Sequence, residues 1–319
     1  MKEKNRPKII AIVGPTASGK TALSIELAKK FNGEIVSADS RQIYEGMDIG
    51  TAKPKIFKPK NFKNWLLTPY INEDKIPHYL MDIKKPSSDY SLAQYKKDAI
   101  KAIKHILEKN KLPILIGGTG LYVKAILDNL KIPKAKPNPL LRKKLENDLK
   151  EKGLNYLVKE LIDIDPESAY IVDLKNPRRV IRALEIVITT EKPLSSQRKI
   201  GPKLFNALIL GINPGKEILK EKIIKRTYQM FEQGLISEVQ NLISKYGKNV
   251  KAFDAIGYRE IIDYLENKIS KQEAIDQIIK NTINYAKRQM TWFKKEKDII
   301  WIKNNKQAEK LVSNFIKIN

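Results

Sequence analysis

Gly14-Pro15-Thr16-Ala17-Ser18-Gly19-Lys20-Thr21 is the stretch that decides the fold, because it matches the phosphate-binding loop (P-loop) spacing of glycine, four residues, glycine, lysine and a hydroxyl residue. The apolar run 8–13 before it predicts a buried parallel strand, and residues 22–29 after it predict a helix. In that setting backbone N–H groups and the helix N-terminus bind phosphate oxygens, Lys20 neutralises them, and Thr21 is a candidate Mg²⁺ ligand. The motif predicts a phosphate ligand without specifying ATP.

Length and composition limit the class of protein. The chain has 319 residues and no cysteine, which allows one large or two moderate domains and excludes a disulfide framework, cysteine-ligated zinc and thiol catalysis. The first apolar run is too short for a signal peptide or a membrane span. We expect a soluble, cytoplasmic protein that does not engage a membrane.

The charge balance indicates a polyanionic partner. Lys and Arg total 61 against 36 Asp and Glu, a formal net charge of +25, which exceeds what solubility requires. Nucleic acid is the first candidate. A lysine-rich proteome with ordinary solvated helix faces is the alternative, and charge alone does not separate the two.

A second predicted strand, 34–38, leads into Asp39-Ser40-Arg41-Gln42. In open parallel sheets the residues just past the carboxyl ends of strands face the ligand crevice, so Asp39 should lie beside the phosphates and is a candidate general base. Capping of the next turn by Asp39 or Ser40 is an equally good interpretation.

The third predicted strand, 113–116, follows a predicted helix over 91–110 and ends in Gly117-Gly118-Thr119-Gly120. An ATP-hydrolysing P-loop enzyme usually carries an acidic Mg²⁺ ligand here, so its absence argues against an ATPase. The glycines permit close approach of the backbone to a ligand, and a purely structural turn before the helix 121–127 fits equally well. Between these segments, residues 55–77 are expected to be a mostly irregular surface excursion. His78 and His105 are too isolated for a metal site and are interpreted as ordinary structural residues.

The remaining pattern predicts a helical insertion in an α/β fold. A proline and lysine linker over 133–139 precedes predicted helices at 139–152, 154–161 and 176–188, after which 206–212 returns to strand character. Helices then follow from 214, at 235–245, 254–265 and 270–287, before a closing strand at 298–302. We predict a P-loop NTPase-like parallel sheet core flanked by helices, formed by residues 1–132 and 201–319, with an inserted α-helical domain at 133–200.

Two basic segments suit RNA. Helical spacing places Arg178 and Arg179 on the side of Arg182, which fits RNA phosphates and equally fits a solvated helix face. The run 285–295 interleaves lysine and arginine with aromatic residues and could offer charge and stacking.

With these segments in hand, the chain resembles the tRNA dimethylallyltransferases, also called tRNA isopentenyltransferases. The motifs that carry the resemblance span nearly the whole chain in family order: residues 14–21, Asp39-Ser40, 46–54, Pro77-His78, Asp82-Ile83, 117–119, 176–179 with 182–185, 256–259 and 286–292. The excursion between Pro54 and Pro77 is longer than in many bacterial relatives. The cysteine-ligated zinc extension of longer eukaryotic relatives is missing, so the resemblance is to the short bacterial form.

The resemblance implies transfer of a dimethylallyl group from dimethylallyl diphosphate to N6 of the adenosine 3′ of the anticodon, tRNA position 37, in tRNAs that read codons beginning with U. Asp39 would accept a proton from the amine, and Thr119 would position the flipped adenine. Mg²⁺ on Thr21 would help to stabilise the leaving diphosphate. The implied diphosphate ligands are Gly14, Pro15, Thr16, Ala17, Ser18, Gly19, Lys20, Thr21 and Arg226.

The implied partner is the anticodon stem-loop of tRNA, and we expect a monomer. The implied tRNA-binding residues are Asp39, Ser40, Arg41, Gln42, Thr119, Arg142, Arg178, Arg179, Val180, Ile181, Arg182, Ile256, Gly257, Tyr258, Arg259, Lys287 and Arg288. Two alternatives to this function are a small-molecule P-loop kinase, which predicts ATP consumption, and a nonenzymatic RNA-binding P-loop protein, which predicts RNA affinity without chemistry.

Overall fold

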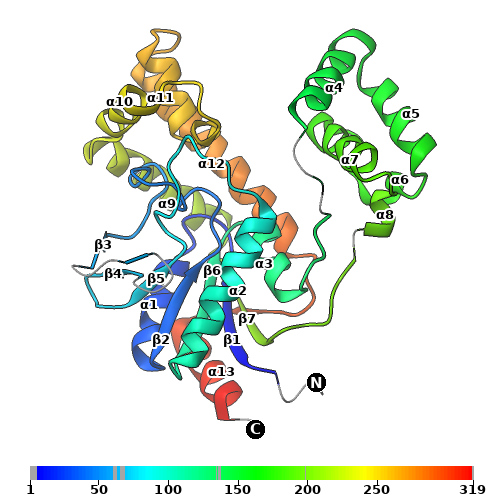
Figure 1. The fold of residues 1–319 in the computed structure, drawn as a ribbon. Coiled ribbons are helices and arrows are strands. Elements are labelled where there is room, and N and C mark those ends of the chain that lie inside the picture. The colour runs from blue at the N-terminus through cyan, green and yellow to red at the C-terminus, as the bar shows by residue number, and fades with distance from the viewer. Residues whose placement is uncertain are drawn as a thin grey trace. The chain divides into compact units, whose positions relative to one another are not determined.

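The protein divides into two compact units (Figure 1). A computed structural model describes residues 6–59, 63–64, 69–133, 135, 138–197 and 199–317. The core unit comprises residues 1–127 and 204–319, and the helical unit comprises residues 128–203. The sequence-based boundaries, at 132 and 200, lie within the helical unit by a few residues, and positions 134, 136 and 137 of the expected linker lie outside the described residues.

In the described part of the core unit, eight strands form one sheet, in the order β3-β4-β5-β2-β6-β1-β7-β8. Their bounds are β1 Lys8–Val13, β2 Gly33–Ser37, β3 Ile56–Phe57, β4 Tyr70–Asn72, β5 Pro77–Tyr79, β6 Leu112–Gly117, β7 Asn206–Ile212 and β8 Ile299–Ile302. β5, β2, β6, β1, β7 and β8 run parallel. The predicted parallel sheet is therefore confirmed, with the strand that leads into the P-loop at its centre.

Helices cover both faces of this sheet, which explains why its central strands are continuously apolar. One face packs on α1 (Lys20–Lys30) and α13 (Asn305–Lys317), and the other on α2 (Leu92–Glu108), α3 (Gly120–Leu127) and α12 (Lys271–Phe293). α2 begins at the expected position, because the Ser91 hydroxyl and the Gln94 side chain form a capping box. α13 was not predicted from the sequence.

The excursion over 55–77 departs from its expected irregular structure. β3 and β4 pair with each other antiparallel, and β4 pairs antiparallel with β5, so the excursion adds an edge to the parallel sheet. β-branched and aromatic residues on these short strands suit that pairing. Residues 60–62 and 65–68 lie outside the described part of the chain.

Four further elements of the core unit follow β7: α9 (Lys216–Glu232), α10 (Leu235–Tyr246), a 3₁₀ helix (Lys251–Asp254) and α11 (Tyr258–Leu265). α10, the 3₁₀ helix and α11 share an apolar cluster with Ile43, Tyr44 and Met47. This cluster supports the segment that follows β2. No helix in the described part of the chain is long and apolar enough to cross a membrane.

The helical unit contains α4 (Pro139–Lys152), α5 (Leu154–Ile164), α6 (Ser168–Ile171), α7 (Pro177–Thr190) and α8 (Leu194–Gln197). Asn138 and Asn176 cap α4 and α7 with their side-chain oxygens, and a proline opens each helix. Val180 and Ile181, which the resemblance implied to be tRNA-binding residues, are 0% and 4% exposed. Both form part of the apolar core of the unit.

Candidate active site

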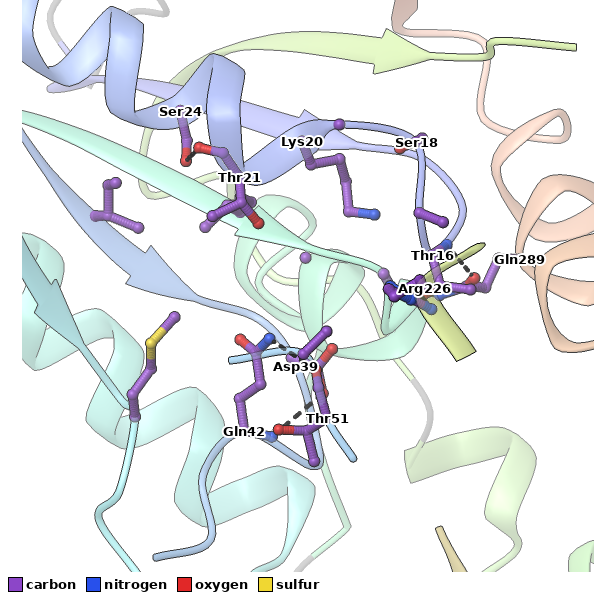
Figure 2. A pocket seen from close by; sticks show the side chains of 18 of the residues that line it. Thr16, Ser18, Lys20, Thr21, Ser24, Asp39, Gln42, Thr51, Arg226 and Gln289 are labelled. Carbon is purple, nitrogen blue, oxygen red and sulfur yellow. Dashed lines mark hydrogen bonds between the residues drawn. The ribbon is translucent and has the colours of Figure 1, made fainter. Parts of the chain in front are cut away.

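A cavity lies at the carboxyl ends of β1, β2 and β6, the edge at which open α/β sheets bind ligands. Its wall brings together the P-loop, Asp39, the end of β6, Arg226 from α9 and two residues of α12. Figure 2 shows Lys20 extending into the cavity from the start of α1, with Asp39 and Gln42 on the opposite side. Segments more than 200 residues apart in the chain thus meet at one site, as the discontinuous core predicted from the sequence requires.

The P-loop backbone depends on its two glycines. Gly14 and Gly19 have φ angles of 147° and 96°, and a Cβ on Gly14 would lie 2.5 Å from the Ile212 carbonyl oxygen. α1 begins at Lys20, so the N-terminal end of this helix lines the cavity. The buried Ser18 hydroxyl has no hydrogen-bond partner among the described residues. This arrangement is a site for an anion.

Two cations converge on the loop. The Lys20 ammonium donates to the Pro15 carbonyl oxygen at 2.6 Å, and the Arg226 guanidinium donates to the Thr16 hydroxyl at 2.8 Å. Burial lowers the pKa of Lys20 to about 8, while Asp39 opposes that shift and Arg226 adds to it. Burial also lowers the pKa of Arg226, again opposed by Asp39. An anion that enters the cavity stabilises the charged form of both side chains.

Asp39 both caps the turn after β2 and lines the cavity. Its Oδ1 accepts hydrogen bonds from the backbone N–H groups of Arg41 at 2.8 Å and Gln42 at 3.4 Å, so the carboxylate caps the turn after β2. Its Oδ2 has no hydrogen-bond partner among the residues that the structure describes. The turn therefore holds the carboxylate in place and leaves one oxygen able to accept a proton in the cavity.

Thr119 is tied to the same turn. Its Oγ1 accepts from the Ser40 N–H at 3.2 Å, and its hydroxyl lies 3.4 Å from the Ser40 hydroxyl. A Cβ on Gly117 would lie 2.1 Å from the Ala38 carbonyl oxygen, so only glycine allows the ends of β2 and β6 to approach this closely. The glycine segment is thus a structural turn that also forms cavity wall.

Sequence reasoning missed Gln289 as a site residue. Its side-chain oxygen accepts from the Thr16 N–H at 2.8 Å and its amide donates to the Gly118 carbonyl oxygen at 2.9 Å, which links the P-loop to the end of β6. Tyr285, one turn earlier on α12, also lines the cavity, where burial and then Asp39 raise its pKa to about 12, opposed by a hydrogen bond with Thr119. The sequence signal was their four-residue spacing, which places both residues on the same side of a helix.

The neighbouring residues of α12 face outward. Lys287 and Arg288 are exposed, and the Arg288 guanidinium lies 5.7 Å from the centre of the Tyr285 ring. Both basic side chains remain candidates for RNA contact, whereas the predicted mixed basic and aromatic run separates into a cavity face and a solvent face.

The segment 46–54 is fixed by α10 and α11. Glu238 accepts from the backbone N–H groups of Asp48, Ile49 and Gly50 at 3.0, 2.7 and 3.2 Å. The fully buried Tyr258 donates its hydroxyl to the same carboxylate at 2.6 Å. Tyr258 therefore supports this segment rather than presenting its ring to solvent.

The other residues of the 256–259 motif divide by exposure. Gly257 is buried and donates its N–H to Glu260 at 2.8 Å, Ile256 is partly buried, and Arg259 is exposed. Arg41 is partly buried and donates to the Ala252 carbonyl oxygen at 3.1 Å. Of this group, Arg259 is the exposed basic side chain.

The arginine surface of the helical unit consists of Arg142, Arg178, Arg179 and Arg182. Arg182 and Arg142 lie 3.2 and 3.9 Å from the buried Glu185, and Arg179 lies 3.0 Å from Asp173. The side chains of Arg142, Arg179 and Arg182 are 43%, 60% and 42% exposed, and Arg178 is also exposed. Val180 and Ile181, also implied to bind tRNA, present no side chain to this surface, because both pack in the core of the helical unit.

The cavity has a mixed lining. The P-loop, Lys20 and Arg226 line it together with the apolar residues Ile35, Met81 and Ile116. Within the described residues, no group of three or more His, Cys, Asp and Glu could hold a metal ion by itself. Thr21 lines the cavity, and a hydroxyl beside diphosphate oxygens and water is a donor set that Mg²⁺ accepts.

Comparisons with known proteins agree on one family. A protein-family model described as IPP transferase matches residues 42–296, and one described as Isopentenyl transferase matches residues 7–72. The tRNA dimethylallyltransferase of Acetivibrio thermocellus is 42% identical over 96% of each chain. That of Bacillus mycoides is 42% identical over 94% of this chain and 91% of its own.

Solved structures give the same result for the fold. The tRNA isopentenylpyrophosphate transferase of Bacillus halodurans superposes with a TM-score of 0.68 and 37% identity, covering 98% of this chain and 96% of its own. A eukaryotic dimethylallyltransferase described as acting on tRNA gives a TM-score of 0.77 and 29% identity, covering 97% of this chain and 79% of its own.

Proposed function

This chain belongs to the IPP transferase family, and on that premise we propose that it transfers a dimethylallyl group from dimethylallyl diphosphate to N6 of the adenosine 3′ of the anticodon in tRNA. The observation that carries the proposal is the meeting of an anion-binding P-loop, a carboxylate and an apolar wall in one cavity. β6 ends in glycines rather than in an acidic Mg²⁺ ligand, which disfavours a phosphoryl-transfer alternative.

The P-loop end of the cavity receives the diphosphate. Lys20, Arg226 and the N–H groups at the start of α1 stabilise the negative charge that grows on diphosphate as its bond to carbon breaks. Fixed, partly desolvated cations do this with little reorganisation, because hydrogen bonds to Pro15 and Thr16 already hold them. Departure of the diphosphate leaves allylic cation character on the five-carbon group.

Asp39 serves the nucleophile. The turn fixes its Oδ1, so Oδ2 orients the N6 amine and accepts its proton as the new bond to carbon forms. Thr119, whose Oγ1 accepts from the Ser40 N–H next to Asp39, is proposed to position the adenine, and Gln289 links the P-loop to Gly118. The adenine must leave its stack to reach this point, which costs least for an unpaired loop base.

Mg²⁺ is the proposed cofactor. The Thr21 hydroxyl and the donor's own diphosphate oxygens would hold it, since Mg²⁺ commonly binds through few protein ligands and substrate phosphates. When bound, it neutralises part of the diphosphate charge.

RNA binding is assigned to exposed basic residues of both units. The arginine surface would contact phosphates of the anticodon stem, while Arg259, Lys287 and Arg288 would meet the loop. Ser40, Gln42 and Ile256 are proposed to contact the bases near the target. We further propose that the protein acts as a monomer in the cytoplasm, on tRNAs that read codons beginning with U.

Single-turnover transfer tests this function. Purified protein, Mg²⁺ and labelled dimethylallyl diphosphate are incubated with an anticodon stem-loop that carries either adenosine or guanosine at the target position. We expect label in the adenosine RNA alone. Label in neither RNA, together with ATP turnover on a small acceptor, would support a kinase and refute the proposal.

A further inference from the structure

His78 is a buried polar residue of the cavity that the proposed reaction leaves unused. It lies on β5 and pairs in register with Ile35 on β2, so the two side chains share one face of the sheet. Ile35 belongs to the apolar cluster beneath α1. His78 lines the cavity and is 1% exposed, and neither Nδ1 nor Nε2 has a hydrogen-bond partner among the described residues.

The cavity wall does not satisfy this imidazole. Ile35, Met81 and Ile116 have no side-chain donor or acceptor of comparable strength. Two polar residues of the wall are already engaged: the Ser24 hydroxyl donates to the Thr21 carbonyl oxygen at 2.8 Å, and the Gln42 amide donates to the Thr51 carbonyl oxygen at 3.3 Å. Buried polar groups in folded proteins are nearly always hydrogen-bonded to protein, ordered water or ligand, so His78 offers a hydrogen bond to whatever polar atom enters the cavity beside it.

The chemistry of the ring limits what that atom can be. Burial lowers the pKa of His78 to about 4, so near pH 7 the ring is neutral and presents one N–H donor and one nitrogen acceptor. A neutral ring does not repel an allylic cation formed in the same cavity, and it does not require a charged ligand. A hydroxyl, which both donates and accepts, fits either nitrogen.

We propose that His78 is a specificity residue for the donor, and that its imidazole hydrogen-bonds a hydroxyl on the five-carbon tail. The enzyme then uses a hydroxylated allylic diphosphate in addition to dimethylallyl diphosphate, whose hydrocarbon tail offers His78 no partner. This inference rests on the proposed function, because it takes the cavity to be the donor site.

The chemical step is unchanged by the hydroxyl. The bond between C1 of the donor and the diphosphate oxygen breaks, and diphosphate leaves with the electron pair. A bond forms between C1 and N6 of adenine, and the N6 proton passes to Asp39. The tail hydroxyl remains in the modified nucleoside, so no oxidant or reductant is needed.

A competition experiment tests the proposal. Full-length protein, Mg²⁺ and the adenosine stem-loop receive equal concentrations of dimethylallyl diphosphate and 4-hydroxy-3-methylbut-2-enyl diphosphate, and the two nucleoside products are separated by mass spectrometry. We expect both products from the wild-type protein. His78→Phe should lower the ratio of hydroxylated to unhydroxylated product about tenfold, the effect of one lost hydrogen bond.

Two further variants separate polarity from packing. Met81→Leu changes an apolar residue of the same cavity and should leave the product ratio within about twofold, since thioether and alkyl groups pack alike. His78→Asn keeps a donor and an acceptor and should retain more hydroxylated product than His78→Phe. Thermal melting of each variant checks its fold.

Three results would overturn the inference. The first is transfer of only the unhydroxylated group by the wild-type protein. The second is an unchanged product ratio in His78→Phe, or in His78→Leu if His78→Phe does not fold. The third is a product ratio in His78→Asn equal to that in His78→Phe. Each of these leaves dimethylallyl transfer, and hence the proposed function, intact. If the wild-type protein forms neither product, both the role of His78 and the proposed function are refuted.

Discussion

The cavity of the core unit and the arginine surface of the helical unit hold their charges in opposite ways. In the cavity, the Lys20 and Arg226 side chains donate hydrogen bonds to P-loop residues, and burial lowers the pKa of each. In the helical unit, Arg142, Arg179 and Arg182 pair with acidic residues while 42–60% of each side chain stays exposed. Charges withdrawn from water act strongly at short range, whereas exposed charges are weakened by water and salt.

This difference separates two roles for the positive charge of the chain. The buried set suits stabilisation of a leaving group, where a fixed cation has a large effect on rate. The exposed set suits a long polyanion, where many weak phosphate contacts add up to affinity. Changes in the cavity should therefore alter turnover with little effect on RNA binding, and changes on the arginine surface should do the reverse.

Asp39→Asn gives the largest expected effect. The amide cannot accept the N6 proton, so single-turnover transfer should slow by about 10²- to 10⁴-fold, while the dissociation constant for the stem-loop changes by less than about threefold. Rapid-quench kinetics and fluorescence anisotropy measure the two quantities. Glu45→Gln removes an exposed carboxylate six residues away and serves as the control. Unchanged turnover in Asp39→Asn would remove Asp39 as the base.

Arg226→Ala comes next. Loss of a cation that contacts the P-loop should lower kcat/KM for dimethylallyl diphosphate by about 10²- to 10³-fold, with RNA affinity nearly unchanged. Lys225→Ala, its exposed neighbour on α9, removes the same charge from the solvent side and should stay within about twofold of wild type. Equal losses in the two variants would show that the total charge matters and the position of Arg226 does not.

The pH profile of donor capture tests Lys20. Burial places its pKa at about 8, so the ammonium is charged below that pH and loses its proton above it. The value of kcat/KM for the donor should therefore fall about tenfold per pH unit above pH 8. Lys20→Arg keeps its charge at any accessible pH and should remove this decline, whatever its activity at neutral pH. A decline that persists in Lys20→Arg would assign the titration to another group.

Arg182→Ala should have the smallest effect of these changes, and it should weaken RNA binding rather than turnover. We expect RNA affinity to weaken several-fold and the slope of log K against log salt to fall by about 0.7–0.9 for one lost phosphate contact. Turnover at saturating RNA should not change. Lys159→Ala, an exposed charge on α5, is the matched control. An unchanged salt slope in Arg182→Ala would exclude a phosphate contact there.

Much of the fold could be predicted because periodicity and spacing encode it locally. β1, β7 and α4 have the bounds expected from their apolar patterns and their flanking residues. Asp39 was placed correctly in the cavity, because strand ends in a parallel sheet converge on one edge.

What could not be predicted depends on contacts between distant segments. Gln289 joins two loops that lie more than 170 residues before it in the sequence, and His78 becomes a cavity residue only when β5 pairs with β2. Val180 and Ile181 lie next to basic positions in the sequence, but the turn of α7 directs them into the core. β3 and β4 are too short for a periodic signal and exist because the sheet edge pairs with them.

The fate of the bridging oxygen of the donor distinguishes transfer of the five-carbon group from phosphoryl transfer. Dimethylallyl diphosphate carrying oxygen-18 between C1 and the first phosphorus is incubated with the adenosine stem-loop, and RNA and released diphosphate are analysed by mass spectrometry. We expect all the oxygen-18 to leave with diphosphate and the RNA to gain the five-carbon group alone, because the cavity stabilises cleavage of the C1–O bond. A phosphorylated RNA, with the oxygen-18 retained in a five-carbon alcohol or monophosphate, would contradict this expectation.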